Sequence, residues 1–234
     1  MISIIIPTFN DIDKLKVSLV SINNQTVKDA EIIIVDDCSD KVVRDELLGF
    51  EFAFPTEIYR LDKNSGSQVA RNHGFERSKG DYVIFWDADV IGRLDMLETM
   101  LNELKIRPEA SYAYSSYWWG RKRFEQWEFD EEKLKHMNYI HTTSLIRREH
   151  FPGFDPVIKR FQDWDLWLTM LNQGRVGAFI PLYLFRVQTG GTMSSWLPKR
   201  AYRKPFKYVL PKRMRNAVKN YEHAVDVIKK KHNL

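Results

Sequence analysis

The sequence predicts an α/β protein in which helices flank a mostly parallel sheet and a basic helical tail follows. Two observations support this fold class. Short apolar runs alternate with segments of helical periodicity through the first half of the 234 residues, and such alternation is typical of parallel sheets. The apolar runs also show little polar alternation, which indicates strands buried on both faces.

The elements of the first half follow from the spacing of apolar residues. The segment from Ile2 to Ile6 is a nearly unbroken apolar run, whereas Leu15, Leu19 and Ile22 recur at helical spacing. On the same criteria we expect strands at residues 2–6, 31–35, 56–61 and 81–86, and helices at residues 12–22, 42–48, 68–78 and 94–105.

The pattern changes after residue 105. Tyrosine and tryptophan are concentrated in residues 111–129, and apolar residues dominate a later helical segment. We expect a strand near residues 139–147, a buried helix at residues 163–173, strands at residues 176–180 and 182–187, and a flexible loop at residues 189–195.

Composition limits the class of protein. The single cysteine, Cys38, excludes an intrachain disulfide and a cysteine-rich zinc cluster. The run from Met1 to Pro7 has neither the basic segment of a signal peptide nor the apolar length of a membrane span. We therefore expect a cytoplasmic protein.

Charge is unevenly distributed along the chain. Residues 199–234 carry a net charge of +10, which leaves −5 on residues 1–198. Apolar residues from Met214 to Ile228 recur at spacings of three and four, which predicts a basic amphipathic helix in this tail. Its apolar stripe can pack on the body. Alternatively, the helix can bind another partner. It can also bind a membrane surface, and the protein would then be membrane-associated. We expect no nucleic acid partner, because no recognised binding module is present.

Polar residues at the carboxyl ends of the predicted strands are the first candidates for a site, since ligands of open parallel sheets bind there. These ends carry neither the G-x-G-x-x-G dinucleotide motif nor a G-K-[ST] phosphate loop. Instead, Asp87 and Asp89 follow the most apolar strand. Two such carboxylates can bind one Mg²⁺ or Mn²⁺, which would neutralise a departing diphosphate. The alternative is a solvated turn, because Asp-x-Asp occurs twice more in the chain.

A series of motifs extends from residue 2 to about residue 195. These are SIIIPTFN at residues 3–10, IIVDDCS at 33–39, NSG at 64–66 with ARN at 70–72, WDAD at 86–89, GFD at 153–155, FQDWDLWL at 161–168 and FRVQTG at 185–190. In order and spacing they resemble the inverting family 2 glycosyltransferases with the GT-A fold.

The resemblance implies transfer of a sugar from a nucleotide-diphosphate donor to a hydroxyl acceptor, with inversion at the anomeric carbon. It implies a glycosyltransferase domain at residues 1–198, with a nucleotide-binding half at 1–89 and an acceptor-side half at 90–198, followed by the tail at 199–234. UDP is the expected nucleotide, because the residue matching Asp37 most often binds uracil. Carried over by position, the donor-binding residues are Thr8, Phe9, Asp37, Arg71, Asp87 and Ala88, and the ligands of Mn²⁺ or Mg²⁺ are Asp89 and Asp87.

Asp163 matches the catalytic base of the family. An inverting transfer is a single in-line displacement, which needs one base on the acceptor side and a metal ion beside the leaving group. By its position alone, Asp163 is equally well a first-turn acid of the helix that it begins.

Two residues depart from the family pattern. Gln162 stands where the family usually has Glu, and Gln188 stands where a histidine often supplies a further metal ligand. An amide is a poorer metal ligand than either a carboxylate or an imidazole. His141 is an alternative ligand from another strand, although a lone histidine in an apolar segment is more often a core residue.

Two further segments are candidates for substrate contacts. The aromatic residues between 117 and 127 suit an acceptor surface, because sugar rings and apolar lipid stems pack on indole rings; the alternative is core and loop. The glycine-rich loop at residues 189–195 suits a lid over the donor.

The sequence therefore predicts a metal-dependent inverting glycosyltransferase whose acceptor is a saccharide or a lipid-linked molecule. Surface polysaccharide or glycolipid assembly is the setting suggested by analogy. Two other functions stay open. One is a nucleotide-sugar-binding protein without catalysis, which the two glutamines suggest. The other is an interaction module that acts through its basic tail.

Overall fold

A computed structural model describes residues 1–190 and 210–234, which fall into two compact units, Met1–Thr189 and Gly190–Leu234. The second unit contains helix α8 (Lys212–Lys231), where the sequence predicted a basic helix. Most of the predicted loop at residues 189–195 lies outside the described residues. None of the helices in these two ranges combines the length and the hydrophobicity needed to cross a membrane.

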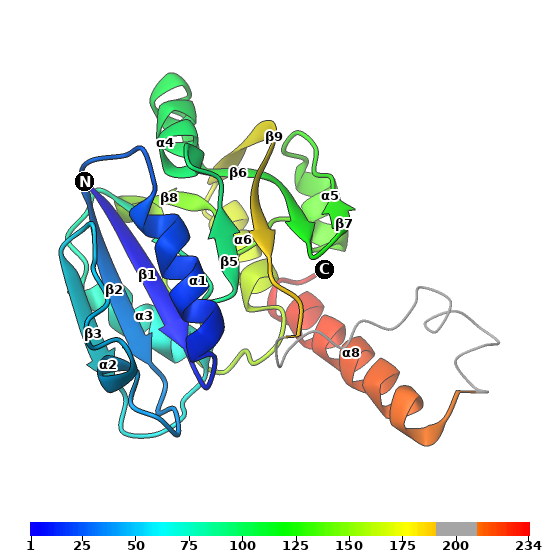
Figure 1. The fold of residues 1–234 in the computed structure, drawn as a ribbon. Coiled ribbons are helices and arrows are strands. Elements are labelled where there is room, and N and C mark those ends of the chain that lie inside the picture. Colours follow the sequence, from blue (N-terminus) through cyan, green and yellow to red (C-terminus); the bar gives the residue numbers. More distant parts are fainter. Residues whose placement is uncertain (191–209) are drawn as a thin grey trace. The chain divides into compact units, whose positions relative to one another are not determined.

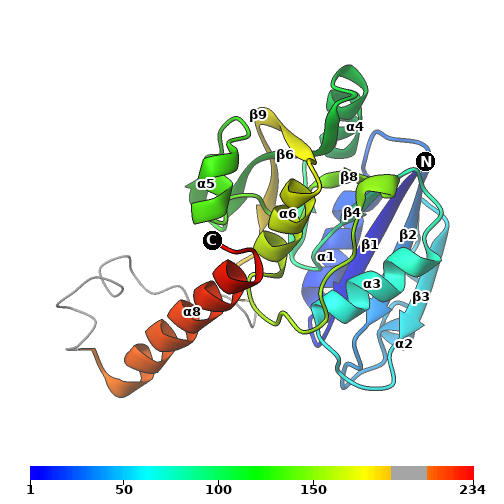
Figure 2. The same cartoon turned by 180° about the vertical axis from the view of Figure 1, so that it is seen from behind.

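The first half of unit one is a parallel sheet with helices on both faces, as predicted. Helix α1 covers one face (Figure 1) and α3 covers the other (Figure 2). All seven residues of β1 are therefore buried. The strands are β1 (Ile2–Thr8), β2 (Ala30–Asp36), β3 (Thr56–Arg60) and β4 (Tyr82–Phe85), and the helices are α1 (Ile12–Asn23), α2 (Val43–Glu46) and α3 (Ser67–Arg77).

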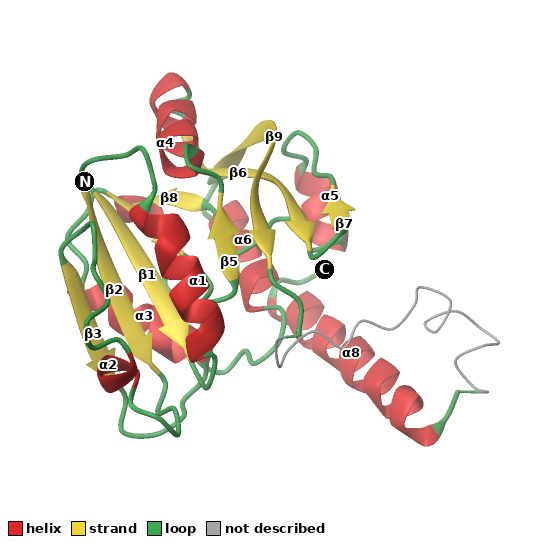
Figure 3. Cartoon of the chain, in the orientation of Figure 1, coloured by secondary structure: helices red, strands yellow, loops and turns green. Residues whose placement is uncertain are grey.

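The second half of unit one mixes parallel and antiparallel strands (Figure 3). Helix α6 lies on the same side of the molecule as α3 (Figure 2). The elements are β5 (Val90–Gly92), α4 (Met96–Ile106), β6 (Ala110–Trp119), β7 (Lys122–Phe124), α5 (Glu131–His136), β8 (Leu145–Arg147), the 3-10 helix η1 (Arg148–His150), α6 (Gln162–Asn172) and β9 (Val176–Val187).

Residues 1–190 contain one nine-stranded sheet with the order β3-β2-β1-β4-β8-β6-β9-β5, in which β7 pairs with β6. The chain moves outward from β1 to β2 and β3, and then returns to β4 on the other side of β1. Ligands of open α/β sheets bind at such a reversal of strand order, beyond the carboxyl ends of the strands. The fold therefore favours a site beyond the ends of β1 and β4.

Two predictions for the second half were wrong. Only Leu145–Arg147 of the predicted strand at 139–147 is a strand, and the residues before it form a loop. The strands predicted at 176–180 and 182–187 are one strand, β9. Its register with β6 shifts where Ser115 pairs with Ile180 and Ser116 with Tyr183. This irregularity accommodates Pro181, which has no N–H to donate to the ladder.

Trp86 holds the turn that carries Asp87 and Asp89 in place. This side chain is fully buried, and its Nε1–H donates to Ser18 Oγ at 2.8 Å and to the Val90 carbonyl at 3.1 Å. The Val90 N–H closes the turn by donating to the Asp87 carbonyl at 2.9 Å. The Asp-x-Asp segment is therefore an ordered turn at the end of β4.

Candidate active site

The carboxyl ends of β1, β2 and β4 bring the predicted donor-binding residues to one edge of the sheet. Thr8 ends β1, and its carbonyl accepts the Asp37 N–H at 2.8 Å. Thr8 Oγ1 is buried and has no partner among the described residues. Phe9 follows it and is 40% exposed, so its ring is available to a ligand.

Asp37 orders the loop that precedes α3. Its side chain is buried, and its two carboxylate oxygens accept the backbone N–H groups of Ser65 at 2.7 Å and Gly66 at 2.8 Å. Gly66 has a φ of +97°, a conformation that L residues rarely adopt. Asp37 therefore holds together two of the motifs that the sequence analysis singled out.

Arg71 connects the two halves of unit one. Its Nη2–H donates to Asp87 Oδ1 at 2.6 Å, and its Nη1–H donates to Gln162 Oε1 at 2.9 Å. The guanidinium also lies over the Phe154 ring at 5.2 Å from the centroid. The side chain is only 5% exposed. The Arg71 guanidinium is thus a fixed counter-charge for Asp87 and a link from α3 to α6.

Gln162 accepts a second hydrogen bond, from Ser67 Oγ at 2.9 Å, and its Nε2–H donates to Gln68 Oε1 at 2.8 Å. The neutral amide therefore has a full set of partners at the N-terminus of α3. A glutamate at this position would pair with Arg71, whereas the amide leaves the charge of Arg71 to Asp87.

Asp163 lies in the first turn of α6, with its carboxylate held at both oxygens. Oδ2 accepts the Asn138 Nδ2–H at 2.8 Å, and Oδ1 accepts the Trp164 N–H at 3.0 Å. The charge of Asp163 raises the pKa of Tyr117 on β6, after the larger effect of burial. The carboxylate is therefore oriented by its own helix and by the loop before β8.

Asp89 is the most perturbed carboxyl group of the site. Burial and the neighbouring Asp87 raise its pKa to about 7, and Lys14 on α1 opposes this shift. Lys14 is itself paired with Asp11 at 3.2 Å. The protein thus leaves the negative charge of Asp89 poorly compensated.

Gln188 lies beside Asp89 at the end of β9. Its backbone N–H donates to the Asp89 carbonyl at 2.8 Å, and its Nε2–H approaches the Lys14 carbonyl at 3.4 Å. The backbone of Gln188 is therefore next to Asp89, while its side-chain amide is turned to the Lys14 carbonyl.

The donor set fits a divalent cation that a bound diphosphate completes. Within residues 1–190 and 210–234, no group of three or more His, Cys, Asp or Glu side chains is arranged to hold a metal. Mg²⁺ at nucleotide sites, however, is commonly held by one or two carboxylates together with phosphate oxygens. Asp87 and Asp89 supply two carboxylates, and the raised pKa of Asp89 reflects a charge that a cation would compensate.

Ala88 differs from the other predicted donor-binding residues. It is only 8% exposed and its side chain belongs to the hydrophobic core. Its backbone alone is left to contact a ligand.

Sequence reasoning missed or undervalued two polar residues of the site. Asn138 was not singled out, because nothing in its local pattern shows that it lies beside Asp163. His141 was ranked as a core residue, and its ring does pack against Tyr117 and Phe185, but after burial the charges of Asp87, Asp163 and Arg71 also act on its imidazole. Both residues belong to the loop between α5 and β8, and His141 lies in the part of it that the sequence analysis took for a strand.

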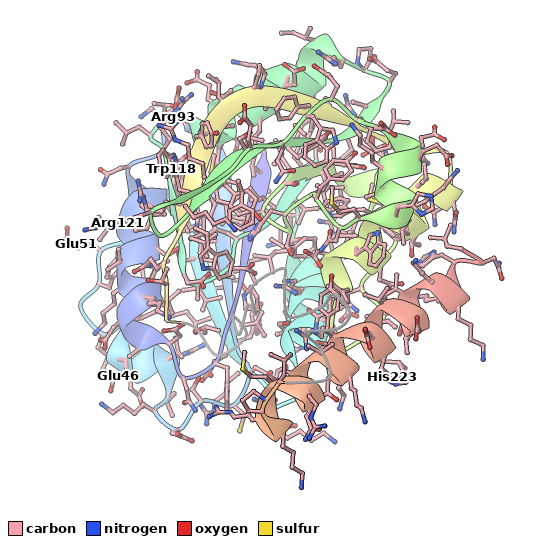
Figure 4. All side chains as sticks on the ribbon, turned by 90° about the vertical axis from the view of Figure 1, so that its right-hand side faces the viewer. Glu46, Glu51, Arg93, Trp118, Arg121 and His223 are labelled. Carbon is pink, nitrogen blue, oxygen red and sulfur yellow. The ribbon has the colours of Figure 1, made fainter. Side chains whose placement is uncertain are left out.

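The aromatic residues of β6 and β7 are divided between core and surface. Tyr117 is buried between Phe124 and Phe185, with ring centroids at 5.0 and 5.1 Å. Trp118 points to the other face, where its ring is covered by Arg123 at 4.9 Å and Arg186 at 5.1 Å. Figure 4 labels Trp118 and Arg121 on this hairpin.

Comparisons with known proteins agree with this architecture. The family model for glycosyl transferase family 2 matches residues 3–160. The chain is 28% identical to an uncharacterized glycosyltransferase of Haemophilus influenzae over 74% of its own length and 63% of that protein. It is 31% identical to TuaG of Bacillus subtilis, a glycosyltransferase provisionally assigned to teichuronic acid biosynthesis, over 74% of this chain and 73% of TuaG.

The fold is shared with solved glycosyltransferases. TarS of S. aureus, solved with UDP, superposes with a TM-score of 0.70 at 16% identity, over 81% of this chain and 60% of that one. The mannosyltransferase PcManGT of Pyrobaculum calidifontis, solved with GDP-Man and Mn²⁺, gives a TM-score of 0.64 at 17% identity, over 86% of this chain and 58% of that one. The sequence match and the shared GT-A architecture establish that this chain belongs to glycosyl transferase family 2.

Proposed function

We propose that this protein transfers a sugar from a nucleotide-diphosphate sugar, with UDP as the nucleotide, to a hydroxyl acceptor with inversion at the anomeric carbon. One observation carries the proposal. Hydrogen bonds through Asp37, Arg71 and Gln162 join the ends of β2 and β4 to the start of α6, so that Asp87 is linked to the residue next to Asp163 and both carboxylates act on the His141 imidazole. A single displacement requires this arrangement of a leaving-group side and a base.

Donor binding follows from the order of the loop before α3. Asp37 fixes the backbone at Ser65 and Gly66, and each of its oxygens has a second lone pair for the N–H of a nucleobase. Phe9, which is exposed at the end of β1, supplies a ring for the base to pack against.

The diphosphate side is formed by Asp87 and Asp89. A divalent cation bound there supplies positive charge that offsets the charge developing on the departing diphosphate. Arg71 keeps Asp87 in place through the 2.6 Å hydrogen bond, and it adds one fixed positive charge behind that carboxylate. Asp89, whose pKa is about 7, is the carboxylate that gains most from a cation.

Asp163 acts as the general base. Asn138 and the Trp164 N–H hold its carboxylate, so a lone pair is directed at the acceptor hydroxyl. The acceptor oxygen bonds to the anomeric carbon while the bond from that carbon to the diphosphate breaks. The hydroxyl proton passes to Asp163, and the configuration at the anomeric carbon inverts.

Relatives support the donor, metal and setting. TarS was solved with UDP and with UDP-GlcNAc, and PcManGT with GDP-Man and Mn²⁺. A further relative, 38% identical over 104 residues, is the poly(ribitol-phosphate) β-N-acetylglucosaminyltransferase TarP of Staphylococcus aureus. Together with TuaG, it supports a saccharide or lipid-linked acceptor in the assembly of a cell-surface glycan.

The test compares wild type with Asp163→Asn in a transfer and donor-hydrolysis assay, using a panel of nucleotide sugars with and without Mn²⁺. Loss of a general base lowers turnover by roughly 10²- to 10⁴-fold, while the Kd of the donor stays the same. Asp95→Asn, at the start of α4 and paired with Arg93, is the matched control and keeps wild-type turnover. Equal turnover in Asp163→Asn and wild type would refute the role of the base.

A second function is favoured by one observation, the neutral Gln162 in place of an acid beside Asp163. A protein that binds nucleotide sugars without transferring them would bind the donor, but neither wild type nor Asp163→Asn would show turnover. An interaction module would bind no donor.

A further inference from the structure

The inference concerns His141, which lies in the loop between α5 and β8. Its ring packs against Tyr117 at 4.9 Å and Phe185 at 5.1 Å between centroids. His141 is partly exposed as a residue, and the charges of Asp87 and Asp163 act on its imidazole after the larger effect of burial, which lowers its pKa. The loop that carries His141 thus reaches the proposed base, since its Asn138 is bonded to Asp163 at 2.8 Å, and His141 itself lies within electrostatic range of Asp87 and Asp163.

The backbone of the same loop determines which ring nitrogen carries the proton. His141 Nδ1 accepts the Thr143 N–H at 3.0 Å, and the His141 carbonyl accepts the Ser144 hydroxyl at 2.8 Å. A backbone N–H can only donate, so Nδ1 is the acceptor and the neutral ring carries its proton on Nε2.

This arrangement opposes a role for His141 as a metal ligand. Binding a cation through Nε2 requires a lone pair there, and the ring proton would then sit on Nδ1, directly facing the Thr143 N–H. The Nε2–H is a donor, and none of the described residues accepts a hydrogen bond from it. It is therefore available to a bound molecule.

The residues around this loop indicate what that molecule is. In an in-line displacement the transferred sugar lies between the diphosphate and the acceptor hydroxyl. We propose that His141 Nε2–H donates a hydrogen bond to a hydroxyl oxygen of the transferred sugar, which makes His141 a specificity-determining residue for the donor. This inference rests on the proposed function, because it needs a nucleotide sugar as the ligand.

The first consequence concerns affinity. A donor that lacks the matching hydroxyl leaves the Nε2–H without a partner inside the site, which is costly. The hydrogen bond adds affinity for the sugar part of the donor and none for the free nucleotide. A change at His141 should therefore alter the Kd of the UDP-sugar and not the Kd of UDP, whatever its effect on turnover.

The experiment measures the Kd of UDP and of the UDP-sugar that wild type accepts, by calorimetry with Mn²⁺ present. His141→Phe keeps an aromatic ring beside Tyr117 and Phe185 but removes both nitrogens. We expect it to weaken UDP-sugar binding about tenfold and to leave UDP binding unchanged. His141→Gln, which retains an N–H donor, should recover part of the loss.

His73→Phe is the matched control, because that half-buried imidazole on α3 packs at 5.7 Å against Tyr59 on β3. It should alter neither Kd. A second measurement uses wild type alone, with donors deoxygenated at one hydroxyl at a time. One deoxygenated donor should bind wild type as weakly as the intact donor binds His141→Phe. That deoxygenated donor should bind His141→Phe no more weakly than it binds wild type.

Several outcomes would overturn the inference. Equal weakening of UDP and UDP-sugar indicates that His141 only supports the loop, and unchanged binding of both removes any role. A raised requirement for Mn²⁺ in His141→Phe indicates a metal ligand. If His141→Phe does not fold, the deoxygenated donors still decide, because equal affinity for all of them excludes the hydrogen bond. If wild type binds no nucleotide sugar, the proposed function fails first.

Discussion

At the scale of single residues, Asp89 has an unusual electrostatic situation. Burial and Asp87 raise its pKa to about 7, far above the usual range of an aspartate. A carboxyl whose pKa is higher in the folded state stabilises the fold only at low pH, below its pKa in the unfolded chain. That contribution is lost progressively as pH rises toward 7, and above pH 7 the full cost of the buried charge is present.

We therefore expect Asp89→Asn to raise the free energy of unfolding of the metal-free protein. The gain over wild type should increase by up to about 3 kcal/mol between pH 5 and pH 8. Urea unfolding in the presence of a chelator measures it. With UDP present, addition of Mn²⁺ should stabilise wild type further and leave Asp89→Asn unchanged. A gain that does not vary with pH would contradict the assigned pKa.

The sequence singled out several residues of the candidate site, but it did not predict which residues they contact. Asp37 and Asp87 follow predicted strands, so the local pattern placed them at one edge of the sheet, whereas Asp163 was singled out by its match to the catalytic base of the family. The partners of Arg71 and Asp163 are remote in the chain, at Gln162 and Asn138. No local periodicity encodes such a contact.

At the scale of elements, the loop at residues 64–66 depends on one carboxylate. Asp37 accepts two backbone N–H groups there, and Gly66 supplies the left-handed conformation before α3. We expect Asp37→Ala to lower the free energy of unfolding by about 1–3 kcal/mol, because two partly buried N–H groups lose their acceptor.

Hydrogen exchange measures this effect locally. The amides of Ser65 and Gly66 should lose protection in Asp37→Ala, and nucleotide binding should weaken with them. Asp40→Ala, which removes an exposed carboxylate bonded to Asn10, is the control and should leave both amides protected. Unchanged protection in Asp37→Ala would show that the loop is held by other contacts.

The sequence predicted helices and strands correctly where burial of the element requires an apolar composition. The parallel strands β1 and β2 are covered on both faces and therefore read as apolar runs. The three-residue strands β5 and β7 are too short to show any period. The loop before β8 was taken for a strand because Tyr139 and Ile140 are buried by tertiary contacts, which have no signature in the local sequence.

At the scale of the whole molecule, the sequence shows a basic tail after an acidic body. Exposed basic residues of α8 include Arg213, Arg215 and Lys219. If the tail binds an anionic membrane surface, replacing these three by Gln should weaken binding to vesicles containing anionic lipid. A loss of about 1 kcal/mol per charge amounts to on the order of 100-fold for three.

Vesicle sedimentation measures this loss, and vesicles of neutral lipid are the control. The difference between wild type and the triple variant should shrink as salt concentration rises, because screening weakens each contact. Wild type that sediments with neither type of vesicle would leave the apolar stripe of the tail as a packing surface and exclude a role at membranes.

The guanidinium of Arg71 connects the two sides of the proposed site. One of its amino groups is bonded to Asp87 at the end of β4, and the other to Gln162, the neighbour of Asp163. A donor phosphate that displaced Arg71 from Asp87 would also disturb the residue next to the base. If donor and acceptor bind at these two sides, occupancy of one would therefore change the affinity of the other, and thermodynamic reciprocity would require the converse.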